Sequence, residues 1–194
     1  MNAFDTAVVT TGYAHDILAA GYEAVGIYLR PDRAPLAMVQ GFQEVGIKIF
    51  SIWEKGEPIS GDYFSAEKGQ ADGQAAIAYA GVIGQTAGSQ IFASVDYDPD
   101  WDQDGDAITA YFQAFQTVVK AAGYLSSVYG SGLTCSQLID AGLAHTGFLS
   151  VSRGFRGYAE FKPNAAIIQE AQITVLDRFQ VDPDTVVDPT VCWQ

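Results

Sequence analysis

The segment AAGYEAVGIYL, residues 19–29, joins the end of a predicted helix to a predicted strand through a single glycine. Glycine is favoured just after a helix because it readily adopts the left-handed conformation that ends the last turn. The apolar residues that follow form a nearly continuous run, which is typical of a strand covered on both faces of a parallel sheet. The segment therefore predicts a helix followed by a buried parallel strand.

The same junction occurs three more times, as EVGIKIFSIW at 44–53, AAGYLSSVYGS at 121–131 and AGLAHTGFLS at 141–150. A repeated helix-to-strand unit predicts alternating strands and helices around a parallel sheet. The clearest predicted helices cover residues 63–83 and 107–122. The predicted strands cover residues 3–8, 24–29, 48–53, 90–95, 125–129, 147–151, 166–169 and 173–176.

This alternation predicts an α/β fold, a small and irregular (β/α)8 TIM-like barrel that forms one domain over residues 1–194. Typical barrels take about 250 residues, so this one is short of helix in its last third. The alternative is an open doubly wound sheet, which usually carries a glycine-rich phosphate loop after its first strand. Here the first strand is followed by TTGYAHD at residues 10–16, which favours the barrel and gives nucleotide binding little support.

The composition excludes several classes of partner. The chain has a formal net charge of −13, which disfavours binding to nucleic acid and to anionic membranes. It has no apolar run of about 18 residues, and its first residues resemble no signal peptide. We expect a monomer without a signal peptide in this chain, and the sequence leaves its location unknown.

The cysteines and histidines are too few and too scattered for a zinc site. Cys135 and Cys192 lack metal-ligand spacing, as do His15 and His145, and no GxSxG motif suggests a serine hydrolase. Free thiols are favoured over a single disulfide. We therefore expect neither a metal nor any other cofactor.

Acidic and aromatic residues recur where the predicted strands end. In a parallel barrel the active site lies at the carboxyl ends of the strands. A strand-end aspartate often only caps a helix or a turn, but recurrence at one rim favours a site. The acids are Asp5, Glu54, Asp96, Asp98, Asp182 and Asp184, and the aromatic residues are Tyr28, Trp53, Tyr97 and Tyr129.

Asp96 and Asp98 form the most suggestive pair. If the fourth strand continues through them, both side chains point to the same side, roughly 6.5–7 Å apart. Two such carboxyls can divide the work of glycoside hydrolysis, since one donates a proton to the leaving oxygen and the other acts at the sugar carbon.

The acidic residues after this pair resemble half of a calcium-binding loop. Asp100, Asp102, Asp104 and Gly105 have the spacing of the first EF-hand ligands, but Tyr111 stands where the loop needs glutamate. We interpret Asp100–Asp106 as an acidic loop before a helix that Asp106 caps, with a looser calcium site as the alternative.

Several motifs together resemble the glycoside-hydrolase-like family known as domain of unknown function 1906, which is related in fold to the family 25 lysozymes. They are FDTA at 4–7, AAGYEAVGIYL at 19–29, GIKIFSIWE at 46–54, YFSAEKGQADGQAAI at 63–77, IFASVDYD at 91–98, VYGSG at 128–132 and VDPDTV at 181–186. The resemblance covers nearly the whole chain in order. It implies a small irregular barrel with an acidic groove.

The resemblance also implies catalytic positions. Family 25 lysozymes use an aspartate on the first strand, Asp-x-Glu on the fourth and an aspartate near the end. By position these places fall on Asp5, on Asp96 with Asp98, and on Asp182. The chain departs from the pattern because Asp98 is not a glutamate, which makes Glu54 the other candidate for the acid.

We therefore expect a glycoside hydrolase acting on peptidoglycan or a related amino-sugar polymer, with its place of action at the cell wall, reached by secretion or lysis. Asp98 or Glu54 would be the acid, Asp96 the base or charge stabiliser, and Asp5 and Asp182 would orient them. A non-catalytic cell-wall glycan-binding module is the main alternative, and a hydrolase that uses calcium or magnesium is a weaker one. The expected substrate contacts are Trp53, Tyr28, Tyr97, Tyr129, Gln169 and Asp184.

Overall fold

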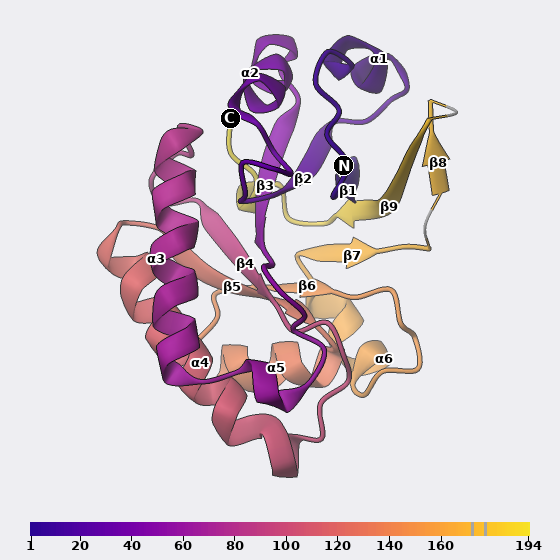
Figure 1. Ribbon diagram of the computed structural model, residues 1–194. Coiled ribbons are helices and arrows are strands. Elements are labelled where there is room, and N and C mark those ends of the chain that lie inside the picture. The colour runs from indigo at the N-terminus through magenta and orange to yellow at the C-terminus, as the bar shows by residue number, and fades with distance from the viewer. Residues whose placement is uncertain (172, 177) are drawn as a thin grey trace.

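The computed structural model describes residues 1–171, 173–176 and 178–194. Within these residues, eight strands close a barrel in the order β1-β2-β3-β4-β5-β6-β7-β9, because β9 pairs with both β7 and β1 (Figure 1). Strands β1 to β7 are parallel to one another, each pairing with the next in the chain. The predicted α/β TIM-like barrel is confirmed.

The elements follow the predicted alternation. The strands are β1 (Asn2–Thr6), β2 (Ala24–Tyr28), β3 (Lys48–Trp53), β4 (Gln90–Ser94), β5 (Leu125–Gly130), β6 (Gly147–Leu149), β7 (Ile167–Gln169), β8 (Ile173–Val175) and β9 (Phe179–Val186). The helices are α1 (Ala14–Ala19), α2 (Leu36–Val45), α3 (Ala66–Val82), α4 (Trp101–Ala121), α5 (Gly132–Asp140) and α6 (Tyr158–Phe161), with short 3-10 turns η1 (Gly61–Tyr63), η2 (Lys162–Asn164) and η3 (Pro189–Val191). None of the helices in the described part of the chain has the length and apolar character needed to cross a membrane.

The closing strand differs from the prediction. The predicted eighth strand, 173–176, corresponds to β8, which pairs only with β9 as a hairpin. The barrel is closed instead by β9, which runs antiparallel to β1 and β7. Only residues 170–178 separate β7 from β9, and a parallel connection needs about a dozen residues or more. The chain therefore turns back and enters the barrel in the opposite direction.

Aromatic side chains fill the lower half of the barrel interior. Phe50, Phe92 and Phe148 are fully buried, and the Phe148 ring meets the other two edge-on at centroid distances of 5.8 and 5.9 Å. Gly26 leaves the room they need, because a Cβ there would lie 2.4 Å from the Phe50 ring. This apolar layer lies directly beneath the polar side chains of the upper half of the barrel.

The helix that follows β4 begins earlier than predicted. Asp100, not Asp106, is its N-cap, since the Asp100 carboxylate accepts a hydrogen bond from the backbone N–H of Asp102 at 3.2 Å. Residues 101–106 are thus the first turns of α4 rather than a loop, where acidic side chains interact favourably with the helix dipole. The helix continues through Gly105. The Trp101 indole packs against the position that a Cβ of residue 105 would occupy. Both cysteines are free, as predicted.

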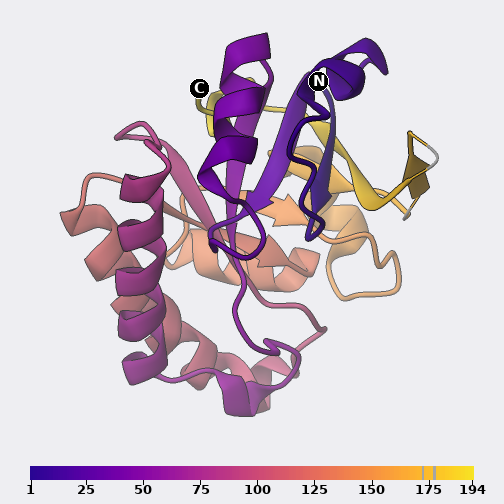
Figure 2. The same cartoon turned by 45° about the horizontal axis from the view of Figure 1, so that its top comes forward.

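Helices α3 and α4 lie alongside each other on one side of the barrel, as Figures 1 and 2 both show. Gly69 of α3 allows this close approach, because a Cβ at this position would lie 2.1 Å from the Tyr111 carbonyl oxygen of α4. That oxygen belongs to the backbone, so the two helices would have to move apart to admit a side chain.

Substituting two glycines of α3 tests this packing. We expect Gly69→Ala to lower the free energy of unfolding by about 1–3 kcal/mol through overpacking. Gly81→Ala is the matched control, since a Cβ there has no neighbour within 4 Å. Alanine has a better helix propensity than glycine, so Gly81→Ala should raise the free energy of unfolding by about 0.5 kcal/mol. Urea denaturation of both variants measures the difference, and equal effects would contradict the packing described here.

Candidate active site

A cavity of about 230 Å³ opens at the carboxyl ends of the parallel strands. Its walls carry four carboxyl groups, two tyrosines and one glutamine that the sequence predicted as site residues. These are Asp5, Glu54, Asp96, Asp182, Tyr28, Tyr129 and Gln169, and Ile52, Ser94, Phe148 and Val151 complete the lining. Each comes from an inward-facing position of its strand or from the residues just after it.

Asp5 lies at the base of the cavity and is almost fully buried, with 1% of its surface exposed. Its carboxylate accepts hydrogen bonds from the Tyr28 hydroxyl at 3.2 Å and from Gln169 Nε2 at 2.9 Å. The Tyr129 hydroxyl donates to Gln169 Oε1 at 2.8 Å and so fixes the orientation of that amide. Burial and the nearby charge of Asp182 raise the pKa of Asp5 to about 7, against the lowering effect of these hydrogen bonds.

Glu54 and Asp96 lie on neighbouring strand ends. Glu54 is half-buried, and burial together with the negative charge of Asp96 raises its pKa. Asp96 is exposed at the cavity mouth, where partial shielding of its carboxyl and the charge of Asp182 raise its pKa. The nearby Tyr129 hydroxyl acts in the opposite direction and lowers the pKa of Asp96. The site thus holds two neighbouring carboxyls that differ in exposure. Such a difference gives two carboxyls different pKa values, so that one can act as an acid while the other stays ionised.

Asp184, predicted as a substrate contact, does not line the cavity. It lies two residues beyond Asp182 on the antiparallel β9, which places it below Asp182 and 3% exposed. Its carboxylate is near the backbone N–H of Asp5, but no group in the described part of the chain meets it with regular hydrogen-bond geometry. Burial raises the pKa of Asp184 well above its usual range. Asp184 is therefore a buried acid under the site, and its burial favours the protonated form.

Asp98 also lies away from the cavity, and the expectation that it shares a strand face with Asp96 is wrong. Strand β4 ends at Ser94, so neither aspartate continues its alternation. Asp98 accepts a hydrogen bond from the backbone N–H of Arg156 at 3.1 Å, and its carboxylate pairs with Nε of the same residue at 3.1 Å. It anchors the segment that precedes α6.

Two of the predicted aromatic contacts face elsewhere. Trp53 alternates with the inward-facing Ile52 and Glu54, so its ring packs outside the barrel wall in the main hydrophobic core. The Tyr97 hydroxyl donates to Asp104 at 3.0 Å, and its ring stacks on Phe64. The aromatic side chains that reach the cavity are Tyr28 and Tyr129, together with the ring of Phe148.

The sequence-based prediction missed two polar contributions to the cavity. Ser94 is the inward-facing residue two positions after Phe92, and strict alternation along β4 would have found it. The backbone N–H of Val151 lies 3.4 Å from Gln169 Oε1, a loop contact that no sequence pattern signals. Within the described residues, no group of three or more His, Cys, Asp or Glu side chains is arranged to hold a metal ion.

Comparison with known proteins gives consistent matches. The family model described as "Rv2525c-like, glycoside hydrolase-like domain" matches residues 15–185. The uncharacterized protein YbfG of Bacillus subtilis is 31% identical over an alignment that covers 80% of this chain and 24% of YbfG. The chain therefore spans about a quarter of that relative's length.

Solved structures share the fold. The Tat-secreted protein Rv2525c of Mycobacterium tuberculosis superposes with a TM-score of 0.81 at 20% identity, covering 100% of this chain and 98% of that one. The modular autolysin LytC of Streptococcus pneumoniae, solved in complex with a synthetic peptidoglycan ligand, gives a TM-score of 0.62 at 10% identity. That match covers 94% of this chain and 46% of LytC. At these identities the likeness establishes the barrel and not its chemistry.

Proposed function

Because the chain belongs to the Rv2525c-like family of glycoside hydrolase-like domains, we propose that it hydrolyses glycosidic bonds in peptidoglycan or a related amino-sugar polymer. The observation that carries this proposal is the cavity where Glu54 and Asp96 face each other with raised pKa values. The peptidoglycan ligand of LytC, which has a similar barrel, supports the choice of substrate. Activity at the cell wall is part of the same proposal.

Glu54 is the proposed general acid, in place of Asp98. Glycoside hydrolysis needs a protonated carboxyl beside the leaving oxygen and an ionised one near the sugar carbon. Half-burial and the charge of Asp96 help Glu54 to keep its proton, whereas Asp96 is the more solvated of the two. Asp96 then stabilises the positive charge that develops on the sugar, or activates the attacking group.

Asp5 and Asp182 complete the proposed machinery from below. Asp182 lies directly opposite Asp5 in the β1–β9 register, and its charge raises the pKa values of both Asp5 and Asp96. The Tyr129 hydroxyl donates to Gln169 Oε1, and the Gln169 amide in turn donates to Asp5. This chain of contacts keeps the acids at fixed positions, which is what transition-state stabilisation requires.

Reducing-end release from purified peptidoglycan, together with loss of turbidity, tests the proposal. Native protein should produce both, and EDTA should not reduce either, because the proposed chemistry uses carboxyl groups alone. Activity that disappears with EDTA and returns with calcium or magnesium would favour a metal-dependent hydrolase instead.

Asp98→Asn should leave turnover within about threefold of native, because Asp98 lies outside the cavity. The Arg156 and Asp98 side chains are 46% and 24% exposed, and exposed ion pairs contribute at most about 1 kcal/mol. Urea denaturation should therefore show only a small loss of stability. A loss of activity of a hundredfold or more, with the fold intact, would return the acid role to Asp98.

A non-catalytic glycan-binding module is the second candidate. The observation in its favour is Asp98, which replaces a glutamate expected from the family 25 lysozymes and is engaged by Arg156. Such a module would retain peptidoglycan in a pull-down experiment and release no reducing ends.

A further inference from the structure

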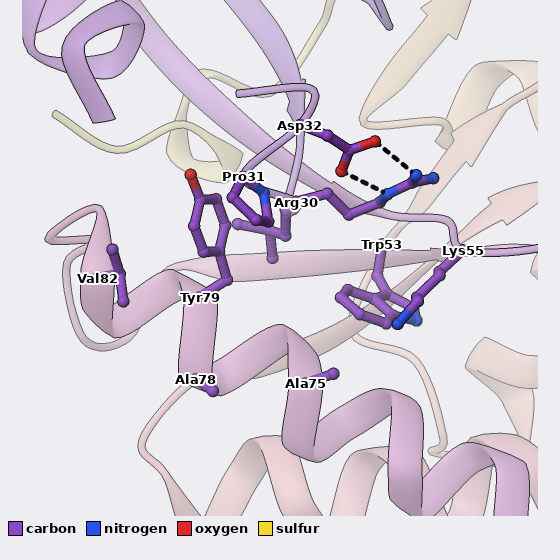
Figure 3. A pocket seen from close by; sticks show the side chains of 10 residues that line it. Arg30, Pro31, Asp32, Trp53, Lys55, Ala75, Ala78, Tyr79 and Val82 are labelled. Atoms are coloured by element: carbon purple, nitrogen blue, oxygen red, sulfur yellow. Dashed lines mark hydrogen bonds and ion pairs between the residues drawn. The ribbon is translucent and has the colours of Figure 1, made fainter. Parts of the chain in front are cut away.

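A second and larger hollow, of about 570 Å³, lies outside the barrel wall beside the acidic cavity (Figure 3). It runs between α3 and the segment that follows β2. Its apolar floor comes from small and medium side chains, and Trp53, Lys55 and Arg30 stand at one end. We call it the outer groove, and define it by Pro31, Trp53, Lys55, Ala75, Ala78 and Tyr79.

The outer groove and the proposed active site lie on opposite faces of the end of β3. Trp53 and Lys55 line the groove, whereas Glu54 between them lines the acidic cavity. Arg30, which also lines the groove, lies with Nη1 3.4 Å from the Glu54 carbonyl oxygen. One end of the groove is therefore formed by the two residues that flank Glu54 in the sequence.

Trp53, which lines the groove, carries a buried hydrogen-bond donor without a partner among the described residues. Its side chain is 3% exposed, and within the described residues its Nε1–H has no hydrogen-bond partner. A buried donor without a partner is costly, so it suggests an acceptor that arrives with a ligand. A buried indole N–H usually has an acceptor, and that of Trp193 donates to the Ser51 hydroxyl at 2.9 Å.

The charge of the groove points to an anionic acceptor. Figure 3 shows Lys55 and Trp53 at the same end of the groove, while Arg30 turns toward Asp32. Asp32 is the one acid among the described residues of the lining, and it is paired with Arg30 at 2.8 Å. Lys55 is exposed and, among the described residues, forms no ion pair. On a chain of net charge −13, an ammonium and an unpaired indole N–H on the described lining of one groove favour a carboxylate as the ligand.

We propose that the outer groove binds the peptide stems of peptidoglycan, with a stem carboxylate between Lys55 and the Trp53 indole N–H. The stems are short, rich in alanine and carry free carboxylates, so their methyl groups match the apolar floor formed by Ala75 and Ala78. This inference rests on the proposed function, since it assigns the part of the same substrate that lies beside the scissile bond.

Binding of soluble fragments to the full chain tests the inference. The ligands are a peptidoglycan disaccharide with its stem, the same disaccharide without it, and the free stem peptide. We expect the stem to improve affinity about tenfold, as one desolvated charge-assisted contact can. The Trp53 indole N–H resonance, assigned with Trp53→Phe, should shift with the free peptide and with the stem-bearing disaccharide, but less when the stem carboxylates are amidated.

Lys55→Gln should reduce the tenfold preference to within about twofold. Lys120→Gln, which removes a charge at the end of α4, is the matched control and should keep the preference. Equal affinity for ligands with and without stems, and an unchanged Trp53 resonance, would overturn the inference while reducing-end release still supports the glycosidase. Absence of binding by every fragment together with absence of reducing-end release would overturn both.

Discussion

Glu54→Gln is expected to lower kcat for reducing-end release from peptidoglycan by about a hundredfold or more. Glutamine has the shape of glutamic acid but no proton to donate, and general acid catalysis contributes about 10²–10⁴-fold to rate. Thermal unfolding and peptidoglycan pull-down should remain close to native, because the amide fits the same half-buried space. The matched variant Asp98→Asn should keep its turnover, since Asp98 is bound to Arg156 outside the cavity.

The pH dependence of the native enzyme gives a second readout of the same group. The raised pKa of Glu54 keeps it protonated to a higher pH than an ordinary glutamate. Activity should therefore fall as pH rises through that pKa. If Glu54→Gln retained more than a third of native kcat, Glu54 would not be the acid.

Asp5→Asn is expected to stabilise the protein at neutral and alkaline pH while it lowers activity. Asp5 is buried, and its pKa rises from 3.8 to about 7 on folding. At about 1.4 kcal/mol per pKa unit, keeping this carboxyl in the fold costs on the order of 4 kcal/mol above pH 7. An asparagine avoids this cost and still offers one acceptor and one donor to Gln169 and Tyr28.

The direction of the Asp5 pKa shift determines the pH range in which Asp5→Asn changes stability. A raised carboxyl pKa means that the native state binds the proton more tightly, so its contribution to stability is present below about pH 3.8 and is lost as pH rises toward 7. The gain in free energy of unfolding from Asp5→Asn should therefore be near zero at pH 3.5, grow across this window and stay constant above it. Urea denaturation at several pH values measures it. A destabilised Asp5→Asn at pH 8 would show that the Asp5 carboxylate is well accommodated when ionised.

The repeated glycine junctions were enough to predict the barrel, because each reports a local event, the end of a helix before a buried strand. The strand-end rule also placed Asp5, Glu54 and Asp96 in one cavity, since parallel strands bring their carboxyl ends to the same side. Asp182 reached the same cavity for a different reason. It lies on a strand that enters the barrel antiparallel, opposite Asp5.

The errors arose where long-range contacts decide the structure. Asp98 was assigned to the site by extending β4 four residues beyond Ser94, where the strand ends, and its partner Arg156 is far away in sequence. Asp184 was placed at the rim because the direction of β9 could not be read from its own residues. The strand-end rule took Trp53 for a rim residue, although alternation with the inward-facing Glu54 turns its ring out of the barrel.

The most direct test of the account measures reducing-end release and peptidoglycan pull-down side by side for native protein, Glu54→Gln and Asp98→Asn. We predict that all three proteins bind, that native protein and Asp98→Asn release reducing ends, and that Glu54→Gln does not. Binding by all three without release by any would contradict the hydrolase and identify the barrel as a glycan-binding module.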